Sequence, residues 1–134
     1  MVVSSVLVID NDIALTDGLK ATLEPRDFDV QTAHEVAEGI NAVHQINPDV
    51  IVLDLYLTEK DGWQVCRDIR EISNTPILIL SVVNNPEAIA QALDEGADDY
   101  LIKPVPSGVL IAHLNKLIRR GRRERATTNS QEEH

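Results

Sequence analysis

Short apolar runs alternate along the chain with longer segments in which apolar residues recur every three or four positions. The short runs are rich in Val, Ile and Leu, and two of them, VIVL and ILIL, are unbroken, which is typical of strands covered on both faces. Strands are predicted at residues 3–9, 28–32, 50–54, 77–81 and 100–102. The longer segments have the spacing of amphipathic helices. The pattern therefore predicts five strand–helix units in series.

Five apolar stripes, together with capping and helix-ending residues, mark the predicted helices. The stripes are Leu15, Leu19 and Leu23; Val36, Ile40 and Val43; Val65, Ile69 and Ile72; Ile89 and Leu93; and Leu110, Leu114 and Leu117. Pro25 is expected to close the first helix, and Asn85 with Pro86 gives the fourth helix a cap and a first-turn proline. Gly96 is expected to end the fourth helix, and Ser107 to cap the fifth.

Strict alternation of strands and helices predicts an α/β fold with a doubly wound parallel sheet. Neighbouring parallel strands need crossover helices, and these helices cover both faces of the sheet. After Gly121 the sequence has no large apolar residue. We therefore expect one domain over residues 1–120, followed by a polar tail or the start of a linker over residues 121–134.

The composition fits one globular domain in a reducing compartment. The chain has 134 residues, of which 43% are hydrophobic, enough to bury a single core. Cys66 is the one cysteine, so no internal disulfide can form. The sequence has neither an apolar run of membrane-spanning length nor a basic segment ahead of Lys20 that would suit a signal peptide. A soluble, cytoplasmic protein without a membrane partner is expected.

The net charge argues against nucleic-acid binding by this domain. At pH 7 the formal net charge is −10, and an acidic body repels phosphate backbones. Five arginines lie together at positions 119, 120, 122, 123 and 125. We interpret this cluster as a solvated helix end rather than as a nucleic-acid contact.

Polar residues that could take part in binding or catalysis lie where the predicted strands end. The carboxyl ends of parallel strands meet at one edge of the sheet, and ligands bind there. The residues at these ends are Asp10, Asn11 and Asp12 after the first strand, Asp54 at the third, Ser81 at the fourth, and Lys103 after the fifth. Acids, a hydroxyl and a lysine are therefore expected to share one crevice.

This set of residues suits phosphoryl chemistry. Clustered carboxylates repel one another unless they share a cation, and oxygen ligands without His or Cys favour Mg²⁺. A carboxylate beside such a metal can attack phosphorus and form an aspartyl phosphate. Lys103 would then neutralise charge on the phosphoryl oxygens, and Ser81 could donate a hydrogen bond to one of them.

Four motifs in order give the chain a family resemblance. They are VLVIDND, PDVIVLDLYLTEKDGW, PILILS and GADDYLIKP. With this order and spacing, residues 3–120 resemble the receiver domains of two-component response regulators, of the CheY-like type. The resemblance implies a flavodoxin-like fold, a five-stranded parallel sheet in the order 2-1-3-4-5 with five helices.

The resemblance also implies a role for each residue of the crevice. Asp54 would be the phosphoacceptor, while Asp10 and Asn11 would hold the two acid-pocket positions. The carbonyl of Tyr56 would complete the Mg²⁺ site. Ser81 takes the place of the hydroxyl switch residue, Tyr100 that of the switch aromatic, and Lys103 that of the phosphate-contacting lysine.

The function implied by the resemblance is phosphorylation-dependent signalling. The domain would accept a phosphoryl group on Asp54 from a histidine kinase or a phosphotransfer protein, without turning over an external substrate. Phosphorylation would alter the face made by the fourth helix, the fifth strand and the fifth helix, which could also hold a second copy in a homodimer.

Departures from the family pattern leave one alternative open, and the D-x-D spacing of Asp10 and Asp12 leaves another. Asn11 stands where the family usually has a second acid, whose charge Asp12 could partly supply, and Val82 stands where Ala or Gly is preferred. A degenerate receiver that acts as a constitutive interaction module is therefore one alternative. The other is a haloacid-dehalogenase-like phosphatase that uses Asp10 and Asp12, although this reading leaves Asp54 without a role. The sequence is compatible with a stand-alone receiver and with part of a longer regulator.

Overall fold

The structure consists of five strands and five main helices that alternate along the chain. A computed structural model describes residues 3–57 and 61–132, with side chains as far as residue 126. The elements are β1 (Ser4–Ile9), α1 (Ile13–Leu23), β2 (Phe28–Ala33), α2 (Val36–Ile46), β3 (Val50–Leu53), α3 (Gly62–Ile72), β4 (Ile77–Ser81), α4 (Pro86–Asp94), β5 (Asp99–Ile102) and α5 (Ser107–Glu132), with a 3-10 turn, η1 (Glu24–Arg26), after α1. Each predicted strand is confirmed to within one residue at either end.

The strands form one parallel sheet in the order β2-β1-β3-β4-β5. This order confirms the predicted topology. β1 pairs with β2 on one side and with β3 on the other, so the order in which successive strands are added to the sheet reverses at β1. Crevices at such a reversal are where open α/β sheets bind ligands. The reversal therefore identifies the edge on which the site should lie.

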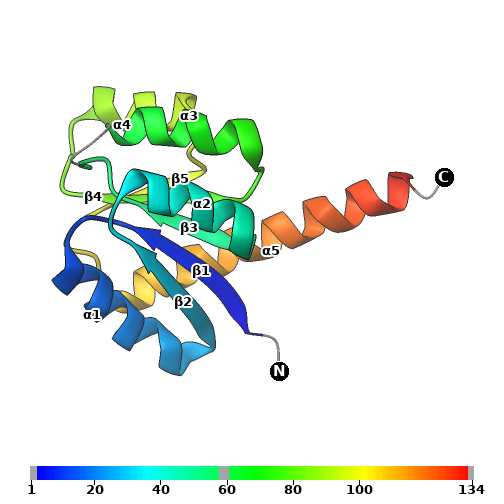
Figure 1. Cartoon of the computed structure of the whole chain (residues 1–134), viewed down its shortest axis with the longest axis horizontal. Helices are drawn as coiled ribbons and strands as arrows, with labels where there is room; N and C mark the ends of the chain where they lie inside the picture. The colour runs from blue at the N-terminus through cyan, green and yellow to red at the C-terminus, as the bar shows by residue number, and fades with distance from the viewer. Residues whose placement is uncertain (1–2, 58–60, 133–134) are drawn as a thin grey trace.

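Helices cover both faces of the sheet, as a doubly wound fold requires (Figure 1). Alternate strand residues point to opposite faces, so each face has its own core. One core joins Leu7, Ile51 and Ile77 to α2, α3 and α4. The other joins Val8 and Val52 to α1 and α5. The continuous apolar pattern of the central strands is explained by this burial on both sides.

Two details of the helices differ from the sequence prediction. On α4 the buried residues are Ala88 and Ala92, whereas Leu93 is 44% exposed. The predicted stripe through Leu93 was wrong because the buried face of this helix is the one that carries Ala88 and Ala92. At the start of α5, the carbonyl of Pro106 accepts the N–H groups of Val109 and Leu110. The helix therefore begins one residue earlier than a Ser107 cap would place it.

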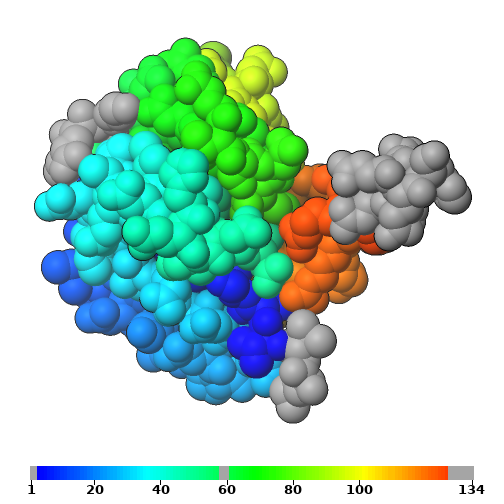
Figure 2. Space-filling view, turned by 45° about the vertical axis from the view of Figure 1, so that its right-hand side comes forward, coloured from blue at the N-terminus to red at the C-terminus, as the bar shows by residue number. Residues whose placement is uncertain are grey.

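Helix α5 extends well beyond the sheet. Its buried apolar residues end at Ile118, yet the backbone stays helical to Glu132. The segment after residue 121 is thus a helical continuation, and its role as the start of a linker stays a prediction. Figure 2 shows the orange part of α5 beside the amino-terminal end of β1, in dark blue. Within the described residues, no helix has the length and apolar character needed to cross a membrane.

Candidate functional site

Pairing of β1 with β3 places two aspartates side by side. Ile9 is the register partner of Leu53, so Asp10 and Asp54 leave their strands together at the carboxyl edge. The N–H of Asp54 donates to the carbonyl of Ile9 at 3.1 Å and fixes this alignment. Both aspartates are buried, with 3% of Asp10 and 8% of Asp54 exposed. The edge therefore carries two closely spaced carboxylates that have little contact with water.

Lys103 brings a positive charge to both carboxylates from the end of β5. Its Nζ lies 3.0 Å from Oδ2 of Asp10 and 3.6 Å from Oδ2 of Asp54. The N–H of Lys103 donates to the carbonyl of Ser81, which ties the end of β5 to β4. Because the charges are close and the site is largely buried, this attraction is only weakly screened. The predicted meeting of Asp10, Asp54 and Lys103 in one crevice is observed.

The surroundings of Asp54 favour the protonated form of its carboxyl group. Burial is the main cause that raises the pKa of this carboxyl above its ordinary value, and the nearby Asp10 raises it further. A hydrogen bond from the N–H of Tyr56, 3.2 Å from Oδ1, opposes the rise, as do the charge of Lys103 and a hydrogen bond from Ser81. A cation that approached this carboxylate would stabilise its charged form.

Ser81 and Tyr100 lie together at the loop between β4 and α4. Ser81 is fully buried, and its Oγ accepts the N–H of Val83 at 3.2 Å. The hydroxyl of Tyr100 donates to the carbonyl of Val83 at 2.5 Å. Burial raises the pKa of the Tyr100 hydroxyl, which keeps it protonated as a donor. Tyr100 is therefore turned toward the β4–α4 loop and bound to it, which its sequence position alone did not reveal.

Asn11 and Asp12 differ in their contacts. Asn11 is exposed directly after Asp10. Asp12 is the N-cap of α1, where its Oδ1 accepts the N–H of Leu15 at 3.1 Å, and its own N–H donates to Oδ1 of Asp10. The carboxylate of Asp12 is thus occupied at the helix end, which argues against its compensating for the missing charge at position 11.

The donor set at this edge consists of oxygen atoms. The structure brings the carboxylates of Asp10 and Asp54 together, and the resemblance adds the side-chain oxygen of Asn11 and the carbonyl of Tyr56. In the chain as far as it is described, no group of three or more His, Cys, Asp or Glu side chains could hold a metal. An amide and a backbone carbonyl would complete the set instead, and such neutral oxygens suit Mg²⁺ together with carboxylates. The residues therefore fit this ion, with one carboxylate fewer than the family pattern.

Exposed apolar side chains follow three of the strands at the same edge. Ile13, Tyr56 and Val82 are 59%, 60% and 58% exposed, and they come just after β1, β3 and β4. The side chain of Val82 is therefore exposed to solvent. Ile13 was not singled out from the sequence, and neither was the Val83 carbonyl that binds Tyr100. A backbone carbonyl carries no sequence signal, whereas an apolar residue at a helix start could have been noticed.

Comparison with known proteins agrees with this geometry. Residues 6–115 match the family model of the response regulator receiver domain. The chain is 38% identical over 120 residues to the transcriptional regulatory protein AfsQ1 of Streptomyces coelicolor, covering 90% of this chain and 53% of that protein. It is 38% identical over 115 residues to the response regulator protein GraR of Staphylococcus aureus, covering 86% and 51%. The chain thus spans about half the length of these relatives.

The fold is also shared with solved structures. A crystal structure of a two-component response regulator from Clostridium difficile superimposes with a TM-score of 0.84 at 33% sequence identity. The match covers 87% of this chain and 97% of that one. The similarity therefore extends over nearly the whole sheet and its covering helices.

Proposed function

The chain belongs to the receiver domains of two-component response regulators, and on that premise we propose that Asp54 accepts the phosphoryl group. A receiver domain is a signalling module and not an enzyme that turns over an external substrate. The phosphatase alternative is therefore wrong, and the use of Asp12 as a helix cap is consistent with this. The contact of Lys103 with both Asp10 and Asp54 is the observation that carries the proposal.

Oδ2 of Asp54 lies farther from Lys103 than Oδ2 of Asp10 does, which favours Asp54 as the nucleophile, although Oδ1 of Asp54 accepts the N–H of Tyr56. Oδ1 of Asp10 accepts the N–H of Asp12 and Oδ2 lies at hydrogen-bond distance from Lys103. Oδ2 of Asp54 is farther from Lys103, at 3.6 Å. In the proposed step an oxygen of Asp54 attacks the phosphorus of a phosphohistidine. The new O–P bond forms, the N–P bond breaks, and the electron pair leaves with the histidine nitrogen.

Mg²⁺ is the cofactor that we propose for this step. Asp10, Asn11, Asp54 and the carbonyl of Tyr56 would hold it, because these residues follow β1 and β3 at the carboxyl edge of the sheet. When bound, the ion would supply positive charge to the phosphoryl oxygens. Lys103 would contribute a second positive charge from β5, and Ser81 would donate a hydrogen bond to one phosphoryl oxygen.

The phosphodonor follows from the family. Membership of the two-component response regulators implies a cognate histidine kinase, and a phosphotransfer protein would present the same phosphohistidine. We place this exchange in the cytoplasm, because Cys66 is buried and unpaired, which suits a reducing compartment.

The proposed response to phosphorylation passes through Ser81 and Tyr100 to the face made by α4, β5 and α5. This face has three partly exposed apolar residues, Leu93, Ile102 and Val109, each between 42% and 44% exposed. Apolar residues of this kind suit a protein contact, and we propose that a second copy or a target binds here. Direct contact of this domain with nucleic acid is not part of the proposal.

One observation favours a second candidate function, the constitutive interaction module, whose interaction face is already formed before phosphorylation. The hydrogen bond from Tyr100 to the Val83 carbonyl is formed around an unmodified Asp54. It holds the Tyr100 ring toward the β4–α4 loop without any phosphoryl group on Asp54. In this alternative, partner binding would be the same with and without phosphorylation. The receiver boundary at residue 120, and the polar tail or linker after it, remain predictions from the sequence.

Intact-mass measurement after incubation with acetyl phosphate and Mg²⁺ tests the phosphoacceptor. We expect one phosphoryl adduct on the wild-type chain and on Asp12→Asn, because Asp12 only caps α1. Asp54→Asn should show no adduct. An adduct of equal yield on Asp54→Asn would contradict the assignment, and an adduct of equal yield in EDTA would contradict the metal.

A further inference from the structure

The end of α5 contacts the sheet through ion pairs, whereas the earlier turns of the helix contact it through apolar packing. Its buried apolar residues pack on β1, β3 and β4 as far as Ile118, which is 3% exposed. The next turns contain Arg120, Arg122 and Arg125, whose guanidinium groups reach the amino ends of the strands. This is the edge of the sheet opposite to Asp54. The attachment changes there from apolar packing to ion pairs.

Asp49 is the first carboxylate that receives these arginines. It stands just before β3, and its Oδ2 accepts the N–H of Ser5 in β1 at 2.8 Å. Nη2 of Arg122 lies 3.4 Å from the same oxygen, and Nη2 of Arg125 lies 3.6 Å from Oδ1. Arg122 also donates to Oγ of Ser4 at 3.3 Å. Asp49 therefore joins the start of two central strands to α5.

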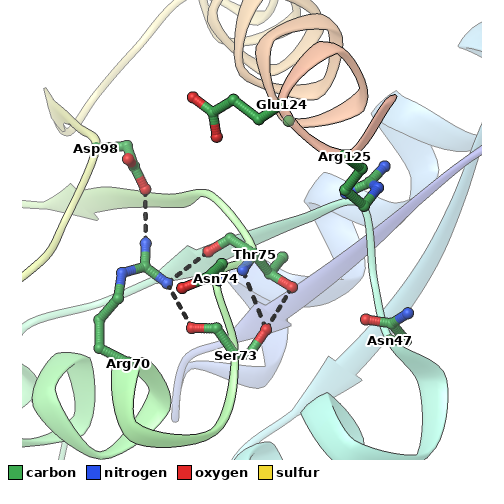
Figure 3. Close-up of a pocket in the computed structure, with 9 residues that line it drawn as sticks. Asn47, Arg70, Ser73, Asn74, Thr75, Asp98, Glu124 and Arg125 are labelled. Carbon is green, nitrogen blue, oxygen red and sulfur yellow. Dashed lines mark hydrogen bonds and ion pairs between the residues drawn. The ribbon is translucent and has the colours of Figure 1, made fainter. Parts of the chain in front are cut away.

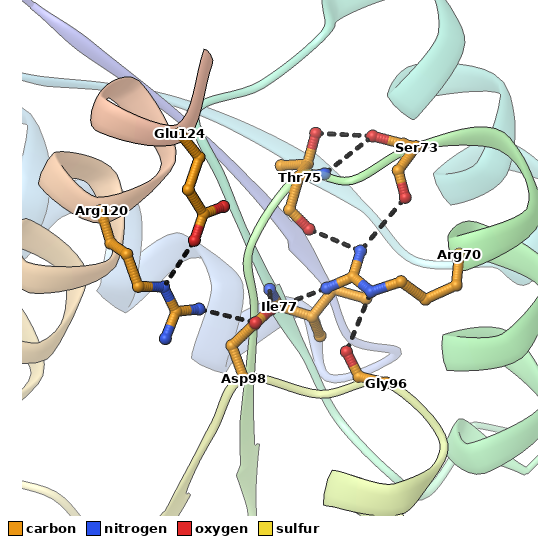
Figure 4. A network of polar contacts seen from close by, with 8 residues as sticks. All are labelled: Arg70, Ser73, Thr75, Ile77, Gly96, Asp98, Arg120 and Glu124. Atoms are coloured by element: carbon orange, nitrogen blue, oxygen red, sulfur yellow. Dashed lines mark hydrogen bonds and ion pairs between the residues drawn. The ribbon is translucent and has the colours of Figure 1, made fainter. Parts of the chain in front are cut away.

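Asp98 is the second carboxylate, one residue before β5. Its Oδ2 accepts the N–H of Ile77 at 2.8 Å and a guanidinium N–H of Arg70 at 2.7 Å. Its Oδ1 accepts Nη2 of Arg120 at 2.6 Å (Figure 4). Arg70 in turn donates to the carbonyls of Gly96 and Thr75. Asp98 therefore joins β4, α3 and α5 at one point.

A polar pocket separates α5 from the loops that follow α2 and α3. It has a volume of about 550 Å³ and lies between Asn47, Asn74 and Thr75 on one side and Glu124 and Arg125 on the other (Figure 3). Most of the side chains that line this pocket are polar. Close packing is present at Gly121, which is buried and at which a Cβ would come within 3.2 Å of Pro76.

We propose that Arg120, Arg122 and Arg125 form an electrostatic latch with Asp49 and Asp98, and that this latch fixes the direction in which α5 leaves the sheet. The folded receiver then extends through residue 125 rather than ending at residue 120. A segment joined to the end of the helix would be held at a fixed orientation to the sheet. This inference does not depend on phosphorylation of Asp54.

The latch also explains the arginine cluster. Three of its five arginines bind carboxylates of the same chain, which leaves Arg119 and Arg123 exposed. For these two, the described part of the chain shows no ion pair. The cluster is therefore used mainly within the domain. The latch pairs involve arginines that are 40% to 53% exposed, so salt should weaken them.

Hydrogen–deuterium exchange on the full chain tests the latch with a matched pair of variants. The double variant Arg122→Gln with Arg125→Gln removes two latch arginines. Arg119→Gln with Arg123→Gln removes the same charge from exposed positions on the same helix. We expect amides of residues 119–128 to exchange roughly three- to tenfold faster in the first variant and to change little in the second. Amides of β1 and β3 should be unchanged in both.

A salt titration gives an independent readout. Raising NaCl should speed exchange in residues 119–128 of the wild-type chain, and should have a smaller effect on the latch variant. Equal exchange in the two double variants would overturn the proposal, because charge alone would then account for the change. Exchange in the wild-type segment that is insensitive to salt would overturn it as well.

Discussion

Nζ of Lys103 lies 3.0 Å from Oδ2 of Asp10, although the two residues are 93 positions apart in the sequence. The contact spans the sheet edge from β5 to β1, and it crosses the position where Asp54 leaves β3. The side chain of Lys103 is 19% exposed and that of Asp10 only 4%, so the pair is largely shielded from water. One cation therefore serves two carboxylates that would otherwise repel each other.

Replacement of Lys103 should affect both stability and phosphorylation. Lys103→Ala leaves Asp10 and Asp54 without their shared cation, and we expect a loss of about 1–3 kcal/mol in the free energy of unfolding at pH 7. The yield of phosphoryl adduct should fall at least about tenfold, because one hydrogen-bonded charge on the phosphoryl group is lost. Urea denaturation and intact mass measure the two effects. Lys116→Ala, an exposed lysine on α5, is the control and should change neither.

The raised pKa of Asp54 predicts a dependence of stability on pH. A carboxyl whose pKa is higher in the folded state contributes stability at low pH, and that contribution is lost as pH rises from 3.8 through the raised value. Asp54→Asn should therefore unfold at higher urea concentration than the wild type at pH 7, and the difference should vanish near pH 3. Asp29→Asn, an exposed position in β2, is the control. A destabilised Asp54→Asn at pH 7 would contradict the burial argument.

Asn11 is expected to limit the affinity for Mg²⁺. Asn11→Asp adds a carboxylate beside Asp10, and the added attraction should tighten Mg²⁺ binding roughly tenfold in isothermal titration calorimetry. Asp12→Asn should change the affinity by less than about twofold, because the Asp12 carboxylate caps α1. A roughly tenfold loss of Mg²⁺ affinity in Asp12→Asn would show that Asp12 contributes to the metal site.

Tyr100→Phe separates the two candidate functions. The variant loses the hydrogen bond to the Val83 carbonyl, at a cost of about 0.5–1.5 kcal/mol in the free energy of unfolding. If phosphorylation acts through this ring, beryllofluoride should shift amide resonances of residues 86–95 in the wild type and much less in the variant. Shifts confined to the surroundings of Asp54 in both chains would favour the constitutive interaction module.

Much of the fold and of the site could be predicted because they depend on local patterns. Apolar runs located the strands to within one residue, since burial on both faces leaves no room for polar residues there. Asp10, Asp54 and Lys103 come together simply because parallel strands end at one edge. Chain position at a strand end was therefore enough to bring these three into one crevice.

Features that depend on distant partners could not be predicted. Leu93 fits the spacing of a core residue, but packing of α4 against the rest of the fold buries Ala88 and Ala92 instead. The helical continuation of α5 depends in part on Asp49, more than seventy positions earlier in the sequence. The orientation of Tyr100 depends on a backbone carbonyl, for which no residue type gives a signal.

Reductive trapping on the wild-type chain tests the central claim most directly, because it locates the phosphoryl group without any substitution. Borohydride reduces an aspartyl phosphate to homoserine and leaves free carboxylates unchanged. After incubation with acetyl phosphate and Mg²⁺, followed by borohydride, peptide mass spectrometry should find homoserine at position 54 alone, and only when Mg²⁺ is present. Homoserine at position 10 or 12, or no conversion of any aspartate, would contradict the assignment of Asp54 as the phosphoacceptor.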